Sequence, residues 1–120
     1  MERVKYIDHT GKKVLLFDFS NCRQSNEVFE IINKAKSVVG KEKTKTVRML
    51  TDVSNTHYSV EVVQGFKEFS KFNSPFALAS AIIGAKGVKK VFLDAVIKFT
   101  GREIKSFDEK EEALNWLSSF

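Results

Sequence analysis

The chain has 120 residues, a formal net charge of +5, eleven Phe, one Cys and one Pro. This length corresponds to one ordinary domain that buries enough surface to fold without cross-links. A single Cys excludes a disulfide framework and a cysteine-based zinc site, and 42% hydrophobic with 29% charged residues excludes a disordered chain.

Two strand patterns open the chain. Val4 and Tyr6 alternate with charged residues, which is typical of a half-buried strand, and Val14–Phe19 is apolar on both faces. The turn signal at His9–Lys12 between them predicts an antiparallel hairpin.

A helix and a third strand follow. Apolar residues at helical spacing from Val28 to Val39 predict an amphipathic helix, with Ser25 or Asn26 as the N-cap and Gly40 as its end. After a Lys-rich loop, Val47–Leu50 predicts a strand.

The second half repeats this alternation. Ser59 stands at the N-cap position of a helix that carries apolar residues on one face as far as Phe72. The remaining predicted elements are a strand buried on both faces at Phe76–Ile83, a helix at Val88–Phe99, a short edge strand at Arg102–Phe107 and a last helix that begins with a capping box of Asp108 and Glu111.

The order of these elements is β-β-α-β-α-β-α-β-α. Alternating strands and helices require crossover connections, so we predict one α/β domain over residues 1–120 with a mixed, mostly parallel sheet of about five strands and about four helices.

The positive charge is carried by sixteen Lys and only four Arg. Lys is a hydrated point charge rather than a bidentate reader of phosphate and bases, so we interpret the run Lys41, Lys43 and Lys45 as an exposed loop and expect no nucleic-acid partner. The longest apolar stretch, Phe76 to Ala85, is half the length of a membrane span, and the N-terminus lacks the apolar core of a signal peptide. We therefore expect a cytoplasmic protein.

Polar residues follow the strands at the edge where open parallel sheets bind ligands. Asp18, Ser20 and Asn21 follow the second predicted strand, and Asp52 ends the third. Two facing carboxylates could bind a metal or act as an acid–base pair. We favour the alternative that both accept hydrogen bonds from loop amides, because no third ligand or nucleophile stands at a diagnostic spacing, and we expect no catalytic residue, metal or cofactor.

Three further positions have two interpretations each. His57 lies close to Ser54 and Ser59, but a nucleophile turn of the form Gly-x-Ser-x-Gly is absent, so an exposed loop histidine is favoured. The loop Gly84–Gly87 resembles a phosphate-binding loop only in its two glycines, which favours a tight turn. Ser59 is first a helix cap, but a hydroxyl at a helix start also accepts a phosphate at low structural cost.

Several stretches resemble STAS domains, which include bacterial anti-sigma-factor antagonists and domains of sulfate transporters. The resemblance is closest to a bacterial subgroup described as anti-sigma-antagonist-like and sometimes likened to CRAL-TRIO lipid-carrier domains. It covers essentially the whole chain and is carried by Lys13–Asn21, Val47–Val53, Ala79–Gly84 with Gly87–Lys90, and Phe107–Leu117.

The resemblance implies a Ser or Thr phosphate acceptor at the start of the helix after the third strand. In the regulatory members, a kinase-type anti-sigma factor adds the phosphate and partner binding is lost. By position the acceptor is Ser59, with Ser54 and Thr56 as neighbours. The family's Asp-Ser-x-Gly context is absent, since Ser59 follows Tyr58 and precedes Val60.

These features predict a non-enzymatic regulatory domain with a protein partner, and the resemblance implies an anti-sigma-factor-like kinase as that partner. Its binding surface would include Asp18, Ser20, Asn21, Asp52, His57 and Tyr58. The alternative is a carrier of a small molecule or lipid in an apolar pocket between the Phe-rich helices and the sheet. An apolar edge strand or exposed Phe patch would also suit a homodimer.

Overall fold

The computed structural model describes every residue except 1, 88–89, 91–93, 95, 99–100 and 102. The elements of the described part are β1 (Val4–His9), β2 (Lys12–Asp18), α1 (Ser25–Val39), β3 (Val47–Asp52), α2 (Val60–Asn73), β4 (Ala77–Ile83), β5 (Lys105–Phe107) and α4 (Lys110–Ser118). The helix expected at 88–99 falls largely on residues outside the described ones.

The strands form one five-stranded sheet in the order β1-β2-β3-β4-β5, the same as their order along the chain. β1 is antiparallel to β2, as the predicted hairpin requires, and the other three pairs are parallel. The prediction of a mixed, mostly parallel sheet is therefore confirmed. β2 lies between β1 and β3, which explains why its sequence is apolar on both faces.

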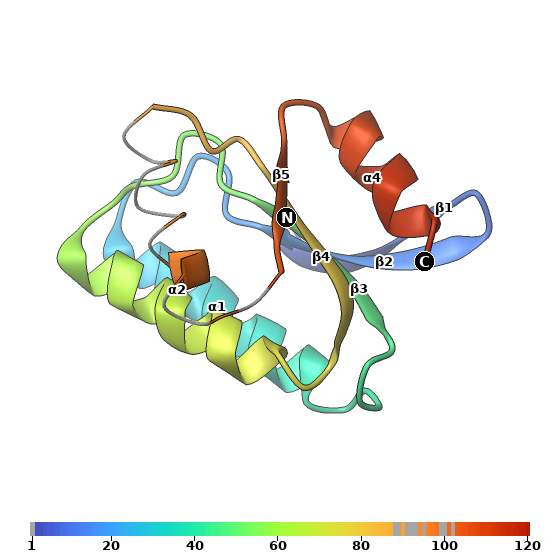
Figure 1. Ribbon diagram of the computed structural model, residues 1–120. Coiled ribbons are helices and arrows are strands. Elements are labelled where there is room, and N and C mark those ends of the chain that lie inside the picture. The colour runs from blue at the N-terminus through green and yellow to red at the C-terminus, as the bar shows by residue number, and fades with distance from the viewer. Residues whose placement is uncertain (1, 88–89, 91–93, 95, 99–100, 102) are drawn as a thin grey trace.

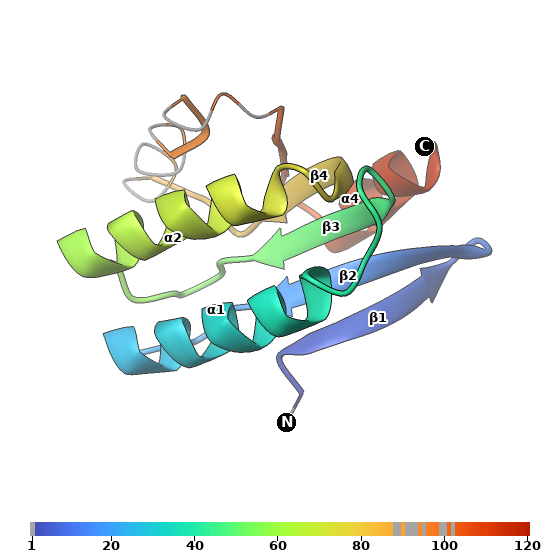
Figure 2. The same cartoon turned by 90° about the horizontal axis from the view of Figure 1, so that it is seen from below.

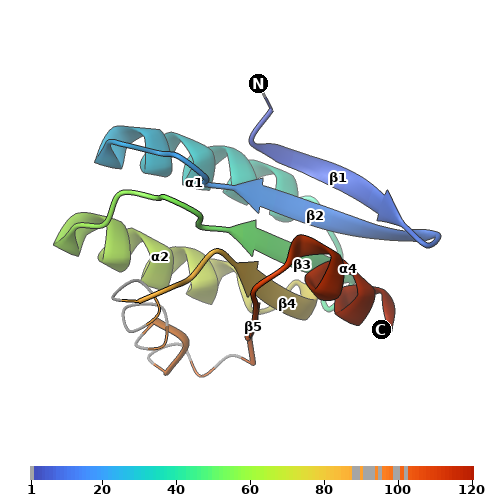
Figure 3. The same ribbon diagram turned by 90° about the horizontal axis from the view of Figure 1, so that it is seen from above.

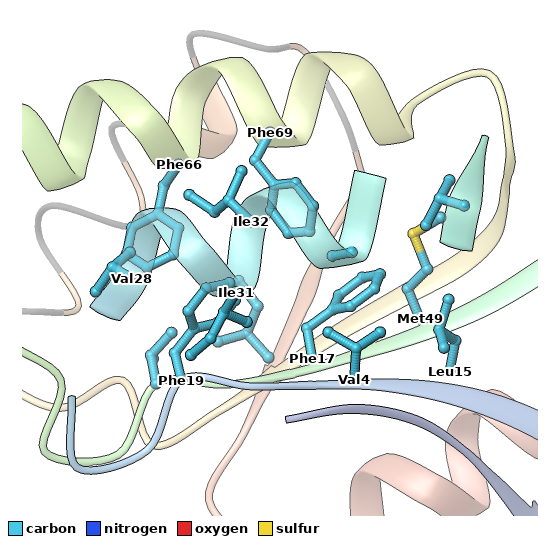
Figure 4. Packing of buried hydrophobic residues seen from close by; sticks show 14 of the residues in the cluster. Val4, Leu15, Phe17, Phe19, Val28, Ile31, Ile32, Met49, Phe66 and Phe69 are labelled. Carbon is cyan, nitrogen blue, oxygen red and sulfur yellow. The ribbon is translucent and has the colours of Figure 1, made fainter. Parts of the chain in front are cut away.

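Helices cover both faces of this sheet (Figure 1). α1 and α2 lie side by side on one face, as Figure 2 shows, while α4 lies on the other. The larger core cluster fills the space under α1 and α2, where buried side chains of the two helices meet those of β2 and β3 (Figure 4). Within it, the Phe17 and Phe69 rings meet edge to face with centroids 5.0 Å apart, and Phe19 and Phe66 do the same. Most of the aromatic content thus serves helix-to-sheet packing.

A second, smaller cluster lies between the sheet and α4. Its strand members, which include Val14, Leu16 and Leu50, alternate with the residues that face α1 and α2. The helix contributes Ala113, Leu114 and Leu117.

Two predicted caps differ from the structure. Ser25 is already the first residue of helix α1, so neither Ser25 nor Asn26 is the cap. The N-cap is Gln24. There the Glu27 carboxylate accepts from the backbone N–H of Arg23 and of Gln24, each at 3.1 Å. The capping box of Asp108 and Glu111 is wrong, because helix α4 starts at Lys110 with Glu109 as its N-cap, which places Glu111 at the second helical position and not the third.

The edge strands also differ from the sequence pattern in detail. Tyr6 is 44% exposed because β1 is an outer strand, and its hydroxyl donates to Glu42 Oε1 at 2.6 Å. Partial burial and this carboxylate raise the pKa of Tyr6 to about 12. β5 is shorter than the predicted strand at 102–107.

Within the described part of the chain, no helix is long and apolar enough to cross a membrane.

Candidate functional site

The carboxyl ends of β2, β3 and β4 meet at one edge of the sheet. Asp18 pairs with Asp52 in the parallel register, and Asp52 pairs with Ile83 on its other side. The expectation that the two carboxylates lie on neighbouring strands is therefore correct. This edge is where open parallel sheets bind their ligands.

Both carboxylates accept hydrogen bonds from the loops that follow them. Asp18 Oδ1 accepts from the Ser20 N–H at 2.9 Å and from the Ser20 hydroxyl, and it lies 3.6 Å from Arg3 Nη1. Asp52 Oδ1 accepts from the Ser54 N–H at 2.9 Å. Among the residues the structure describes, no three His, Cys, Asp or Glu side chains gather as metal ligands would. The geometry favours loop bracing over acid–base chemistry for this pair.

The loop between β3 and α2 is fastened to the loop after β2. Thr56 is only 2% exposed, and its hydroxyl donates to the Phe19 carbonyl at 2.9 Å. The His57 N–H donates to the Cys22 carbonyl at 2.7 Å, while the His57 residue itself is exposed. Asn21 and Asn55 both adopt a positive φ, which Asn tolerates better than most residues, and their side chains meet at 3.3 Å. These contacts hold the loop in one shape.

Ser59 is the N-cap of α2, as predicted. Its Oγ accepts from the Val62 N–H at 3.1 Å and lies 3.4 Å from Ser25 Oγ at the start of α1. Beside it, Val60 is 88% exposed, although a side chain of this kind is usually buried. Burial raises the pKa of the neighbouring Tyr58 to about 12, so this phenol is neutral at physiological pH.

A pocket of about 390 Å³ lies at this helix start. We call it the Ser59 surface, defined by its lining residues Tyr58, Ser59, Val60, Val63, Gln64 and Lys67. These residues bring together apolar side chains, two hydroxyl-bearing residues, an amide and one ammonium group.

A second, more polar pocket of about 340 Å³ lies around Ser54 at the carboxyl ends of the strands. Lys86 and Asp108 line it together with Asn55 and Gly84. Gly84 has φ +85°, and a Cβ there would lie 2.2 Å from Ser54 Oγ and 2.6 Å from the Ser54 nitrogen. Only a glycine allows this close approach of the two loops.

The cavity between the sheet and α2 is small. It has a volume of about 40 Å³ and is lined mainly by apolar side chains that include Phe17, Met49 and Phe66. Pockets that bind small molecules span roughly 300–1,000 Å³. This cavity has room for only a few water molecules in the conformation described.

The structure therefore gathers the predicted residues at one end of the sheet but gives them different surroundings. Thr56 points into the protein, Asp18 and Asp52 brace loops, and Ser59 opens onto a pocket. Sequence reasoning missed the contact of Ser25 with Ser59 and the position of Asp108 beside Ser54. Both join residues far apart in the chain, and no local pattern signals them.

Comparison with known proteins agrees with this architecture. A family model described as SpoIIAA-like matches residues 5–118. The chain belongs to the SpoIIAA-like family. The SpoIIAA-like domain also resembles a crystal structure of an uncharacterized protein from the DUF3478 family with a SpoIIAA-like fold, from Shewanella loihica PV-4. The two share 19% identity with a TM-score of 0.74, over 95% of this chain and 91% of the other, which shows the fold. No curated protein matches the SpoIIAA-like domain significantly.

Proposed function

We propose that this SpoIIAA-like domain is a non-enzymatic regulatory domain that binds a protein partner through the Ser59 surface, and that phosphorylation of Ser59 releases the partner. The observation that carries the proposal is the exposed Val60 beside a helix-capping serine, over a pocket that is already formed. A concave site of this volume, lined by apolar side chains with a few polar groups, is the usual form of a binding site.

A phosphate on Ser59 is compatible with the folded domain. The first turn of α2 has backbone N–H groups that lack partners within the helix, and the helix dipole favours negative charge there. The same phosphate would place about −1.5 to −2 charges next to Val60, where a partner's apolar side chain would otherwise pack. The modification would thus leave the fold intact and weaken the contact.

The other two candidate acceptors fit less well. The Thr56 hydroxyl is buried and donates to the Phe19 carbonyl, so a kinase would have to detach the loop to reach it. Ser54 lies against Gly84 on one side and opens onto a pocket with Lys86 and Asp108 on the other, but unlike Ser59 it is not the N-cap of a helix. We therefore place the switch at Ser59, with Asp18, Asp52 and their loops as its rigid support.

We propose a kinase of the anti-sigma-factor type as the partner, because the chain belongs to the SpoIIAA-like family. The carrier alternative needs an apolar pocket between the helices and the sheet, and the cavity under α2, at about 40 Å³, is roughly sevenfold smaller than the smallest typical ligand pocket.

The test compares partner recovery from cells of the native host with the wild-type domain, Ser59→Ala and Ser59→Asp as baits. Ser37→Asp, on an exposed position of α1, adds the same charge elsewhere and serves as the control. We expect at least one specific partner to be retained by Ser59→Ala and Ser37→Asp and lost by Ser59→Asp. Phosphopeptide mapping of the native protein should find the modification at Ser59. The proposal fails if no Ser or Thr is modified and Ser59→Asp keeps every partner.

A further inference from the structure

One edge of the sheet is only partly covered. Among the described residues, β5 pairs in parallel with β4 at Ala81, Ile82 and Ile83, and Figure 3 shows it on the side of β4 away from β1. Within the described residues, Ala77 and Ala79 have strand partners on the β3 side only. Leu78 between them is the extra residue of a β-bulge, and it is 39% exposed. Among the described residues, Ala77–Ala79 thus has no strand partner on the β5 side, and this part of β4 is an open strand edge.

This edge lies at the bottom of a groove. A pocket of about 630 Å³ runs along the first half of β4, and we call it the edge groove. Ile104 forms a wall on the side of the large core cluster, and Trp116 with Phe120 forms a wall on the side of α4. The strand edge is therefore recessed between side chains from both faces of the sheet.

Aromatic and charged side chains line the groove. The rings of Trp116 and Phe120 stack edge to face with centroids 4.9 Å apart, and Phe120 is 44% exposed. Lys105 Nζ lies 5.7 Å from the Trp116 centroid. Lys45 and Glu103 complete the charged groups that line the groove, which leaves a net positive charge beside an apolar surface.

We propose that the edge groove binds an extended segment of a partner protein, apolar in its centre and flanked by acidic residues, which adds a strand next to Ala77–Ala79. Backbone hydrogen bonds to an open edge give affinity in this mode of recognition, and pockets for alternate side chains give specificity. At about 3.3 Å per residue, the open half of β4 accommodates roughly four residues of such a segment.

A second copy of this chain fits the groove less well. A symmetric dimer needs a patch that is complementary to itself, and two recessed edges cannot fill one another. The two lysines against one glutamate favour an acidic segment over a basic one. The groove is distinct from the Ser59 surface, so it can be tested without reference to phosphorylation.

The experiment is a titration of the isotope-labelled domain with the probe peptide acetyl-Glu-Val-Leu-Val-Glu-amide, followed by the amide signals of the protein. Saturable shifts are expected at Ala77, Leu78 and Ala79 and at the indole N–H of Trp116. The charge-reversed peptide, with Lys in place of both Glu, should bind about tenfold or more weakly, which is one step of 1.4 kcal/mol. Leu78→Asp should weaken binding of the acidic peptide by a similar factor. Val60→Asp, the same change on the Ser59 surface, should leave it unaltered.

A probe with N-methyl groups on its central backbone nitrogens checks the strand mode without altering the protein. It should lose binding even if Leu78→Asp fails to fold. The proposal is overturned if no peptide shifts these signals at up to about 2 mM, which corresponds to less than about 4 kcal/mol of binding. It is also overturned if the N-methyl or charge-reversed peptide binds equally well, or if the shifts lie elsewhere in the domain. A third result against it would be a dimer that already fills the groove and that Leu78→Asp dissociates.

Discussion

Gly84→Ala should destabilise the domain through a contact that the structure locates at one loop. Gly84 has φ +85° and faces Ser54 so closely that a Cβ would lie 2.2 Å from its Oγ and 2.6 Å from its nitrogen. Holding an alanine in the left-handed region costs roughly 1–2 kcal/mol. Forcing extra volume into a packed site adds about 1–3 kcal/mol. The variant should therefore lose about 2–5 kcal/mol.

Gly11→Ala is the matched control. Gly11 has φ +81°, nearly the same as Gly84, but no atom lies within 4 Å of the position of its Cβ. It should lose only the conformational part, about 1–2 kcal/mol. The difference between the two variants isolates the approach of Gly84 to Ser54.

Urea unfolding measures both losses, and amide signals of Ser54 and Asn55 report the displaced loop. If the two variants lose the same free energy and the Ser54 and Asn55 signals do not move in Gly84→Ala, then the two loops do not pack as described. The pocket around Ser54 would then not have the lining described above.

Three further predictions concern the same end of the sheet and the two tyrosines. Ser59→Ala removes the acceptor for the Val62 N–H and should cost about 0.5–2 kcal/mol in urea unfolding, whereas Ser59→Asp should be close to wild type because Asp caps equally well. No loss of stability in Ser59→Ala would show that the cap contributes nothing. Thr56→Val keeps the side-chain shape but removes one of the two donors to the Phe19 carbonyl, which still accepts from the Cys22 N–H at 3.3 Å. It should cost about 0.5–1.5 kcal/mol, and a loss near zero would place the Thr56 hydroxyl in solvent. Tyr6 and Tyr58 have pKa values raised to about 12 from 10.0, so the folded state holds these protons more tightly than the unfolded state; their contribution to stability should be complete below pH 10 and disappear as the pH rises toward 12. An absorbance titration that finds both phenols ionising near pH 10 in the folded protein would contradict this.

The order and type of the described elements could be predicted because they depend on local signals. Ser59 is an example, since a serine before a run of apolar residues at helical spacing defines a helix start without tertiary information. The adjacency of Asp18 and Asp52 followed from parallel pairing of the strands that they end.

What could not be predicted depends on contacts between distant parts of the chain. The sequence offers Thr56 as a neighbouring candidate to Ser59, and only the position of the Phe19 carbonyl shows that the Thr56 hydroxyl points inward. Among the described residues, β5 pairs only with Ala81, Ile82 and Ile83 of β4, and no residue pattern in 102–107 signals where along β4 it pairs. The edge groove lies beside the earlier part of β4, so no local pattern signals it either.

The placement of α4 has a consequence for how the protein is made. The face of the sheet that carries Val14, Leu16 and Leu50 is covered by this helix, the last element described along the chain. Strands pair with their sequence neighbours, so the sheet can assemble as synthesis proceeds while that face still meets water. Until residues 110–118 leave the ribosome, the nascent domain presents an apolar layer of the kind that chaperones bind, and a ribosome stalled before that point would release an aggregation-prone sheet.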